Sequence, residues 1–290
     1  MTTETRARPE GRTMRVVRTR EELRDALASA PRPVGFVPTM GWLHEGHRSL
    51  MRGSKAAEAT TVVSIFVNPR QFGSPEDLAR YPRNEARDLE ICRAEGVDIA
   101  FAPPVDVVYP PGFDTTVSVG AIARPLEGAA RPGHFDGVAT VVAILFDLVR
   151  AERAYFGQKD AQQVMVIRQM AHDLAIPTEV VACPTVREPD GLALSSRNVR
   201  LTPAQRAAAP VLHRALEAGV ALRAAGETSG DAIRAEVGRV LASEPLAAVD
   251  YVSCADARTL LELDRVDGPA LLSLAVLFGT VRLIDNVPLG

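Results

Sequence analysis

Two histidines follow an apolar run in the first fifth of the chain. The stretch PTMGWLHEGHRSL, residues 38–50, comes directly after VGFV at residues 34–37, and it places His44 and His47 three residues apart with Gly46 between them. Stability alone gives this arrangement no evident use. Paired imidazoles can donate hydrogen bonds to phosphoryl oxygens and follow charge as it develops. The stretch therefore predicts a phosphate-binding or catalytic role for both histidines.

The spacing of the two histidines argues against zinc. A metalloprotease helix carries H-E-x-x-H, with histidines four apart, whereas H-E-G-H here places them three apart. Cys92, Cys183 and Cys254 are few, odd in number and widely spaced, which indicates neither a zinc site nor a disulfide framework. The sequence also lacks the G-x-G-x-x-G and G-x-x-x-x-G-K-[ST] motifs. Any nucleotide must therefore be held by the H-x-G-H stretch.

Two other polar stretches follow predicted strands. In VNPRQFG, Asn68 and Gln71 offer amide groups that suit the hydroxyl and carboxylate groups of a small polar substrate. In FGQKD, Lys159 is a compact charge of the kind that binds phosphate. Asp160 beside it is placed either to cap the next helix or to accept from ribose hydroxyls. Gln163, one turn further on, is predicted to face the same crevice.

A third stretch, LALSSRN, stands in the polar segment 185–201 between the two halves of the chain. Two hydroxyls followed by a guanidinium, at Ser195, Ser196 and Arg197, would make a flexible anion clamp. The alternative for this stretch alone is a solvated loop without a ligand.

Short β-branched runs alternate with helical patterns from about residue 34. The runs predict strands at 34–38, 61–67, 98–102, 154–156 and 178–182, and the helical patterns are at 46–58, 84–95, 138–150 and 160–173. This alternation predicts an α/β fold, a parallel sheet with helices on both faces. The histidines then lie where a strand leads into a helix, a usual ligand and phosphate site in open sheets. The helix at 138–150 is apolar nearly all round, so it must be buried in the core or against a partner subunit.

The texture of the chain changes after residue 184. Later helices are predicted at 203–225 and 231–243, and later strands at 249–254, 270–277 and 280–284. We therefore expect a flexible tail at 1–13, a first domain at 14–184 and a smaller α+β domain at 185–290.

Composition excludes several classes of protein. With 290 residues, 47% of them apolar and 24% charged, the chain is typical of a soluble protein of two domains. A net charge of -3 and a pI of about 6.0 argue against a nucleic-acid binder, whose pI usually exceeds roughly 9. The longest apolar stretches fall short of the roughly 18 residues that span a bilayer, and the first dozen residues lack the apolar core of a secretory signal. We expect a cytoplasmic protein without nucleic-acid or membrane partners.

Five stretches together resemble one family. PTMGxLHxGH, FVNPxQF, RPGHFDGV, YFGQKDxQQ and GLALSSRN occur in the order and at the spacing of the pantoate–β-alanine ligases, within the HxGH nucleotidyl-transferase superfamily. The resemblance runs from about residue 34 to residue 201 and more weakly to the C-terminus. It implies a Rossmann-like N-terminal domain, a small C-terminal lid and a cytoplasmic homodimer. It also implies a ligase that uses ATP and Mg²⁺ to join pantoate to β-alanine through a pantoyl adenylate.

The resemblance also implies roles for single residues. The implied catalytic groups, all on the phosphates, are His44, His47, Lys159 and Arg197. The implied ATP site consists of Met40, Gly41, Trp42, Leu43, His44, Glu45, Gly46, His47, Gly157, Gln158, Lys159, Asp160, Val186, Leu194, Ser195, Ser196 and Arg197. Within it, Gly157 and Asp160 would hold adenosine and Val186 would touch the adenine. The implied site for pantoate and β-alanine consists of Asn68, Gln71, Tyr81 and Gln163.

Two departures from the family pattern and one gap remain. Trp42 and Arg48 are bulkier than the small and apolar residues of the family, which leaves the local shape of the pocket wall open. Protein ligands to Mg²⁺ are not assigned. Asp88 is a candidate, but Arg87 beside it is a poor companion for a cation, so the ion is expected mainly on ATP oxygens.

Other functions share part of the pattern. A nucleotidyltransferase of the same superfamily would carry a similar HxGH but would have no reason to carry FVNPxQF and QKDxQQ. A non-catalytic nucleotide-binding module would explain the fold, but not four anion-binding side chains from separate segments. An aminoacyl-tRNA synthetase is disfavoured by the acidic balance of the chain.

Overall fold

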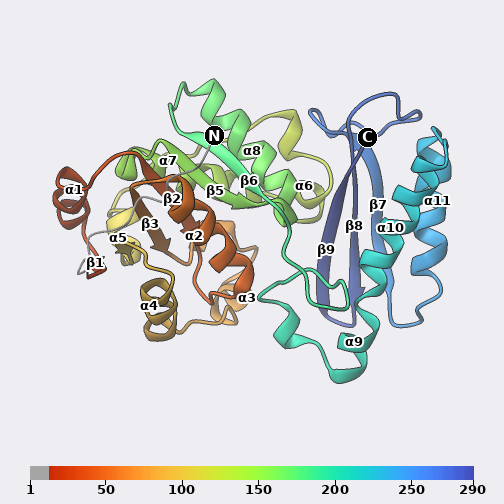
Figure 1. Cartoon of the computed structure of the whole chain (residues 1–290), viewed down its shortest axis with the longest axis horizontal. Helices are drawn as coiled ribbons and strands as arrows, with labels where there is room; N and C mark the ends of the chain where they lie inside the picture. The colour runs from red at the N-terminus through yellow and green to blue at the C-terminus, as the bar shows by residue number, and fades with distance from the viewer. Residues whose placement is uncertain (1–12) are drawn as a thin grey trace, which may run out of the picture.

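The chain forms a six-stranded parallel sheet and a separate three-stranded antiparallel sheet, which lie next to each other in Figure 1. This computed structural model describes residues 13–290. The tail expected at 1–13 lies outside the described residues, apart from Thr13. The expected fold class, a Rossmann-like domain followed by a smaller α+β domain, is confirmed.

The parallel sheet reverses its strand order in the middle. Its strands are β1 (Arg15–Val17), β2 (Val34–Thr39), β3 (Thr60–Ile65), β4 (Ile99–Phe101), β5 (Arg153–Gly157) and β6 (Glu179–Cys183). They are ordered β1-β4-β3-β2-β5-β6. The order therefore reverses between β2 and β5, and the loops that leave these two strands diverge to opposite sides. Such a reversal opens a crevice at the carboxyl ends of the strands.

Helices cover both faces of this sheet. They are α1 (Arg20–Ala28), α2 (Glu45–Ala57), α3 (Pro75–Ala79), α4 (Glu85–Ala94), α5 (Val105–Val108), α6 (Glu127–Ala130), α7 (His134–Val149) and α8 (Ala161–Asp173), with 3-10 turns η1 (Pro69–Gln71), η2 (Ala121–Ala123) and η3 (Gln158–Asp160). Phe36 and Val37, neighbours in β2, belong to two separate cores, because successive side chains of a strand point to opposite faces. One core contains α1, α7 and α8, and the other contains α2 and α4. The apolar helix α7 is buried in the larger core, as one of the two expected alternatives required.

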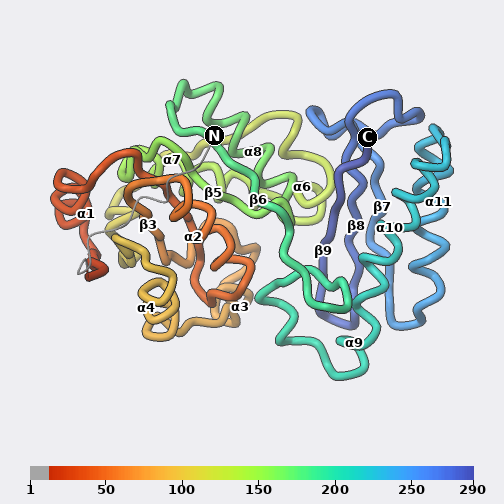
Figure 2. The backbone as a smooth tube through the Cα atoms, in the orientation of Figure 1, coloured from red at the N-terminus to blue at the C-terminus, as the bar shows by residue number. Residues whose placement is uncertain are grey.

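The antiparallel sheet carries its helices on one side. It pairs β7 (Ala248–Asp256), β8 (Ala270–Phe278) and β9 (Val281–Leu289) in that order. The other elements of this part are η4 (Asn198–Arg200), α9 (Pro203–Ala208), α10 (Val211–Ala224) and α11 (Gly230–Leu241). In Figure 2, α10 and α11 lie on the outer side and β9 faces the larger domain, where it contacts η3. We propose the domain boundary near residue 184, because the parallel sheet ends at Cys183 and the second core begins at Leu192.

Besides the short helices α3, α5 and α6, which were not expected, the structure differs from the expected elements at three main places. The alternation begins before residue 34, with β1 and α1, so β2 is a central strand of the sheet and not the first strand of the chain. The helix expected at 203–225 is divided into α9 and α10 around Pro210, whose ring and missing N–H disfavour a continuous helix. β9 extends past the expected end at residue 284 to Leu289. Among residues 13–290, no helix has the length and apolar character needed to cross a membrane.

Candidate active site

A cavity of about 310 Å³ lies between the two sheets. The loops after β2, β3 and β5 line it from the larger domain, and the segment that leads out of β6 and the strands of the smaller domain line its other side. This volume lies within the range of small-molecule binding sites. The two loops at the reversal of the strand order, after β2 and β5, both reach it, as the topology predicts.

His44 and His47 hold each other at the start of α2. His44 occupies the N-cap position, and its Nδ1 accepts the backbone N–H of Gly46 at 3.2 Å. The Nδ1 of His47 accepts the backbone N–H of His44 at 3.3 Å. This reciprocal pairing has the spacing of a capping box, in which the N-cap and N3 side chains satisfy free N–H groups. The expectation that the spacing has no use for stability is therefore wrong.

The capping bonds also fix the state of both rings. Because each Nδ1 accepts a hydrogen bond, a neutral ring must carry its proton on Nε2. Burial, and then the charge of Lys159, lowers the pKa of His44 to about 4. Burial, and then the neighbouring His44, lowers the pKa of His47 to about 3. Near pH 7 both rings are neutral, and each has an Nε2–H that the cap does not use.

Gly46 is required by the His44 ring. A Cβ at this position would lie 2.9 Å from Cε1 and 3.0 Å from Nδ1 of His44. The first distance is shorter than real Cβ contacts and the second is at their lower limit, so a side chain at this position would require the His44 ring to move. The glycine thus secures the position of the imidazole itself.

The loop between β2 and α2 is anchored from α4. The two carboxylate oxygens of Asp88 accept the backbone N–H groups of Trp42 and Leu43, each at 2.8 Å. The guanidinium of Arg87 lies 5.3 Å from the centre of the Trp42 ring. Arg48 pairs with Glu95 on the outside of α2. Among the described residues, the cavity lining does not include Trp42 or Arg48.

Lys159 and Asp160 form an ion pair in the turn after β5. Asp160 takes the N-cap position of α8, but within the described chain its carboxylate pairs with Lys159 Nζ at 3.3 Å and not with the helix backbone. Burial opposes ionisation of Asp160, yet Lys159 and then Arg197 hold its pKa below the ordinary value. Of the two alternatives, the structure thus favours a charged carboxylate in the cavity over a helix cap.

Asn68 positions Gln71. Its Nδ2 donates to Oε1 of Gln71 at 3.0 Å and to the carbonyl of Gly137 at 2.9 Å. Its Oδ1 accepts from the backbone of Arg70 at 3.2 Å and from the Tyr109 hydroxyl at 2.7 Å. All hydrogen-bonding positions of this amide are therefore engaged within the protein. Asn68 lines the cavity, yet it acts on a ligand mainly by orienting the Gln71 amide.

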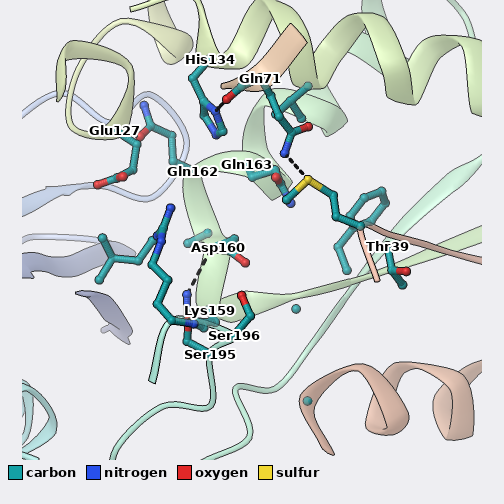
Figure 3. A pocket seen from close by; sticks show the side chains of 18 of the residues that line it. Thr39, Gln71, Glu127, His134, Lys159, Asp160, Gln162, Gln163, Ser195 and Ser196 are labelled. Carbon is teal, nitrogen blue, oxygen red and sulfur yellow. Dashed lines mark hydrogen bonds and ion pairs between the residues drawn. The ribbon is translucent and has the colours of Figure 1, made fainter. Parts of the chain in front are cut away.

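The side chains sort into two groups around the cavity (Figure 3). Gln71, Gln163 and His134 lie at one end, and Lys159, Ser195 and Ser196 lie together at the other. The Gln71 amide donates to the Met40 sulfur at 2.9 Å. Burial raises the pKa of the Tyr81 hydroxyl, against the effect of its hydrogen bond with Ser196. The amide end suits a small polar molecule, and the lysine and serine end suits an anion.

The cavity brings most of the expected site residues together. Those in its lining are Met40, His44, Gly46, His47, Asn68, Gln71, Tyr81, Gly157, Lys159, Asp160, Gln163, Val186, Leu194, Ser195, Ser196 and Arg197. Among residues 13–290, the expected residues outside the lining are Gly41, Trp42, Leu43, Glu45 and Gln158. Leu43 is fully buried in the α2 core, and Glu45 pairs with Arg52 on the surface.

The start of α7 adds two residues that sequence reasoning left without a role. Nδ1 of His134 lies 2.9 Å from the backbone carbonyl of Gln71, and Arg131 donates to the same oxygen at 3.2 Å. Burial, and then Arg131, lowers the pKa of His134 to about 4. The motif RPGHFDGV contains both residues, so its occurrence among the five family stretches could have indicated that they belong to the site.

Glu127 links the two domains beside the cavity. Its carboxylate accepts from Arg282 at 2.7 Å and from the Tyr251 hydroxyl at 3.1 Å. Its backbone N–H donates to Gln162 at 3.0 Å. These partners are separated by up to 155 positions along the chain, and no local pattern in the sequence indicates such contacts.

The described residues offer no ready-made metal site. Among residues 13–290, no group of three or more histidine, cysteine, aspartate or glutamate side chains could hold a metal ion. Both oxygens of the earlier candidate, Asp88, already accept backbone N–H groups. The donor set therefore does not fit a magnesium ion bound by the protein alone.

Comparisons with known proteins agree with this site. The family described as pantoate-beta-alanine ligase matches residues 15–288. The pantothenate synthetase of Roseiflexus castenholzii is 60% identical over 273 residues, covering 94% of this chain and 98% of that protein. The crystal structure of pantothenate synthetase from Thermus thermophilus is 47% identical, with a TM-score of 0.89, and covers 94% of this chain and 99% of that chain. The ligase structure from Francisella tularensis, described as complexed with beta-gamma ATP and beta-alanine, is 34% identical with a TM-score of 0.78 over 95% of this chain and 97% of that chain. The chain thus belongs to the pantoate-beta-alanine ligase family.

Proposed function

We propose that this chain condenses pantoate with β-alanine, at the expense of ATP, to give pantothenate, AMP and pyrophosphate. The observation that carries the proposal is one cavity at the reversal of the strand order, with anion-binding side chains at one end and amides at the other. A dinucleotide-forming transferase would need no amide end of this kind, and membership of the ligase family makes that alternative weaker.

The triphosphate lies, in this proposal, against His44, His47, Lys159 and Arg197, with Ser195 and Ser196 beside it. The two neutral imidazoles donate through Nε2, and the two cations balance the phosphate charge. Gly157, Asp160 and Val186 hold the adenosine, and Leu194 closes over it.

Pantoate lies at the amide end, against Gln71 and Gln163. Asn68 occupies one side of the Gln71 amide, which fixes the direction of the remaining Nε2–H. The Tyr81 hydroxyl, which also lines the cavity, pairs with Ser196. The acid is thereby aligned with the nucleotide without a covalent bond to the protein, and alignment of this kind reaches effective molarities of about 10⁵ M or more.

The first step forms pantoyl adenylate. A carboxylate oxygen of pantoate attacks the α-phosphorus of ATP, and the bond to the β-phosphate oxygen breaks, so that pyrophosphate leaves with its electron pair. The histidines, Lys159 and Arg197 stabilise the charge that builds up on the phosphate oxygens. This step requires no nucleophile from the protein.

The second step transfers the acyl group to β-alanine. The free amine attacks the carbonyl carbon of the adenylate, the bond to the phosphate oxygen breaks, AMP leaves, and the amine loses a proton. The adenylate is prone to hydrolysis, so water must be excluded between the two steps. We assign the role of the lid to the 185–201 segment and the rest of the smaller domain, because residues of both line the cavity.

Magnesium enters as part of the substrate, MgATP, held mainly by phosphate oxygens and not by a protein site. The proposed homodimer and the cytoplasmic location rest on the family resemblance alone.

The test mixes the protein with MgATP, pantoate and β-alanine in all combinations. AMP should form only when both pantoate and β-alanine are present. Labelled pyrophosphate should exchange into ATP when pantoate is the only other substrate. Binding of ATP without turnover would instead favour a non-catalytic module. AMP formation that is indifferent to pantoate would favour another transferase.

A further inference from the structure

The last strand of the smaller domain holds the turn that carries Lys159. Asn286, on β9, donates through Nδ2 to two consecutive backbone carbonyls, that of Gln158 at 3.0 Å and that of Lys159 at 2.9 Å. Its Oδ1 accepts a longer bond from the Gln158 side chain at 3.4 Å. Asn286 is 5% exposed, so these bonds are shielded from water. One buried amide therefore spans two residues of the turn.

The neighbouring residue of β9 holds a second segment of the site. Asp285, which is 2% exposed, accepts both terminal nitrogens of Arg187, at 2.6 and 3.0 Å. The same carboxylate accepts the backbone N–H of Asn286 at 2.8 Å. Arg187 begins the hairpin in which it pairs with Ala193, just before the Ser-Ser-Arg sequence. Two adjacent residues of one strand thus contact both segments that bring anion-binding groups to the cavity.

We infer that Asn286 is a positioning residue. When β9 is docked on the larger domain, Asn286 orients the turn so that the Lys159 ammonium lies where the phosphates bind. This inference rests on the proposed function. One amide that holds two consecutive carbonyls fixes the orientation of the two peptide groups on either side of the Lys159 Cα. It thereby fixes the direction in which the Lys159 side chain leaves the backbone. Docking of the smaller domain therefore closes the cavity and also positions the Lys159 ammonium in the phosphate-binding site.

A purely structural role would predict a different pattern. Arg282, also on β9, joins the domains through Glu127 and touches no part of the Gln158–Asp160 turn in its hydrogen bonds. If Asn286 served only to dock β9, its loss would act as the loss of Arg282 does. If it acts through Lys159, its loss should matter only while Lys159 is present.

A double-mutant cycle separates these two roles. Asn286→Ala and Lys159→Ala are made singly and together in the full chain, and single-turnover pyrophosphate release with pantoate is measured with enzyme in excess. Asn286→Ala should slow this step by about 10- to 100-fold, as misplacement of a catalytic group does. In the Lys159→Ala background it should add less than about threefold, because interacting residues are not additive.

The matched control is Arg282→Gln, alone and with Lys159→Ala. Its effect should multiply with that of Lys159→Ala, since it weakens docking without touching the turn. Additive effects of Asn286→Ala and Lys159→Ala would overturn the assignment. Non-additive effects of both Asn286→Ala and Arg282→Gln with Lys159→Ala would also overturn it, since both variants would then act through docking.

Folding is checked by circular dichroism and melting temperature. If Asn286→Ala does not fold, Asn286→Asp carries the cycle, because it keeps the shape and replaces the donors by acceptors. If neither variant folds, the amide is a requirement of the fold and the assignment is wrong. Wild-type protein without pantoate-dependent pyrophosphate release would contradict the proposed function itself, whereas active wild type with additive variants would contradict this inference alone.

Discussion

The two walls of the cavity are built on different principles. On the larger domain, His44 and His47 are locked by bonds to their own helix end, within four residues of sequence. On the opposite wall, the Ser-Ser-Arg segment is held from a distance, through Arg187 and Asp285, which are 98 positions apart. The first wall is preorganised by local capping, and the second depends on long-range contacts within the smaller domain. Substitutions of the two histidines should therefore change the chemical step, and loss of the Ser196 hydroxyl should mainly change how well the two steps are coupled.

The largest effect is expected at His47, where chemistry and capping can be separated. His47→Gln should slow pyrophosphate release by about 10²- to 10³-fold, the usual cost of losing one donor to a developing charge. Glutamine at N3 can still close a capping box, so its melting temperature should stay near that of the wild type. His47→Ala should lose the same activity and, in addition, about 1 kcal/mol of capping energy. Near-normal pyrophosphate release by His47→Gln would refute the phosphate role.

A smaller loss of activity is expected at Gly46. Gly46→Ala places a Cβ 2.9 Å from the His44 ring, and the displaced imidazole should slow adenylation by about 10- to 100-fold. Gly238→Ala is the matched control, because a Cβ on that glycine of α11 meets no other atom within 4 Å. Equal activity of the two alanine variants would show that the ring position does not matter.

On the wall formed by the smaller domain, Ser196→Ala should change the ratio of AMP to pantothenate more than the rate of adenylation. Its hydroxyl pairs with Tyr81, and without it the segment should close less tightly over the adenylate. We expect AMP to exceed pantothenate by about twofold or more, since water then competes with the amine. The measurement is the ratio of the two products at saturating β-alanine. A ratio of one, as in a fully coupled enzyme, would count against a lid.

A further effect is on stability in acid. The pKa of His47 is about 3 in the folded chain and 6.5 as its ordinary value. The unfolded chain therefore binds a proton first as the pH falls, so this residue's contribution to stability is complete above pH 6.5 and is lost progressively below it. Between pH 6.5 and 4.5 the wild type should lose more unfolding free energy than His47→Gln, by on the order of 1 kcal/mol per pH unit. The unfolding free energy of both proteins is measured by denaturant titration at each pH. If it falls equally in the wild type and in His47→Gln, the pKa of His47 is not lowered.

How much the sequence predicts also differs between the two walls. The strand exits at His44, Lys159 and Asn68 are read correctly because strand periodicity and polar residues at strand ends are local features. The capping role of the histidines was missed because histidine is an uncommon N-cap. β1 was missed because three residues carry too little pattern.

The contacts between the two domains could not be predicted. Glu127, Tyr251 and Asn286 meet the cavity through contacts between segments more than 100 positions apart. Such contacts arise when the two domains dock on each other, and they produce no recognisable pattern of residue spacing in the sequence. Gln158 shows the same limit, since β9 holds its carbonyl and its side chain away from the cavity lining.

The transfer of oxygen from pantoate tests the central claim most directly. With both carboxylate oxygens of pantoate labelled with ¹⁸O, the attacking oxygen becomes the bridge to the α-phosphorus and leaves with AMP. Mass spectrometry should find one ¹⁸O in AMP and none in pyrophosphate, and His47→Gln should slow the appearance of labelled AMP in proportion to pyrophosphate release. Unlabelled AMP, or label in pyrophosphate, would show that the acid is not adenylated in this cavity.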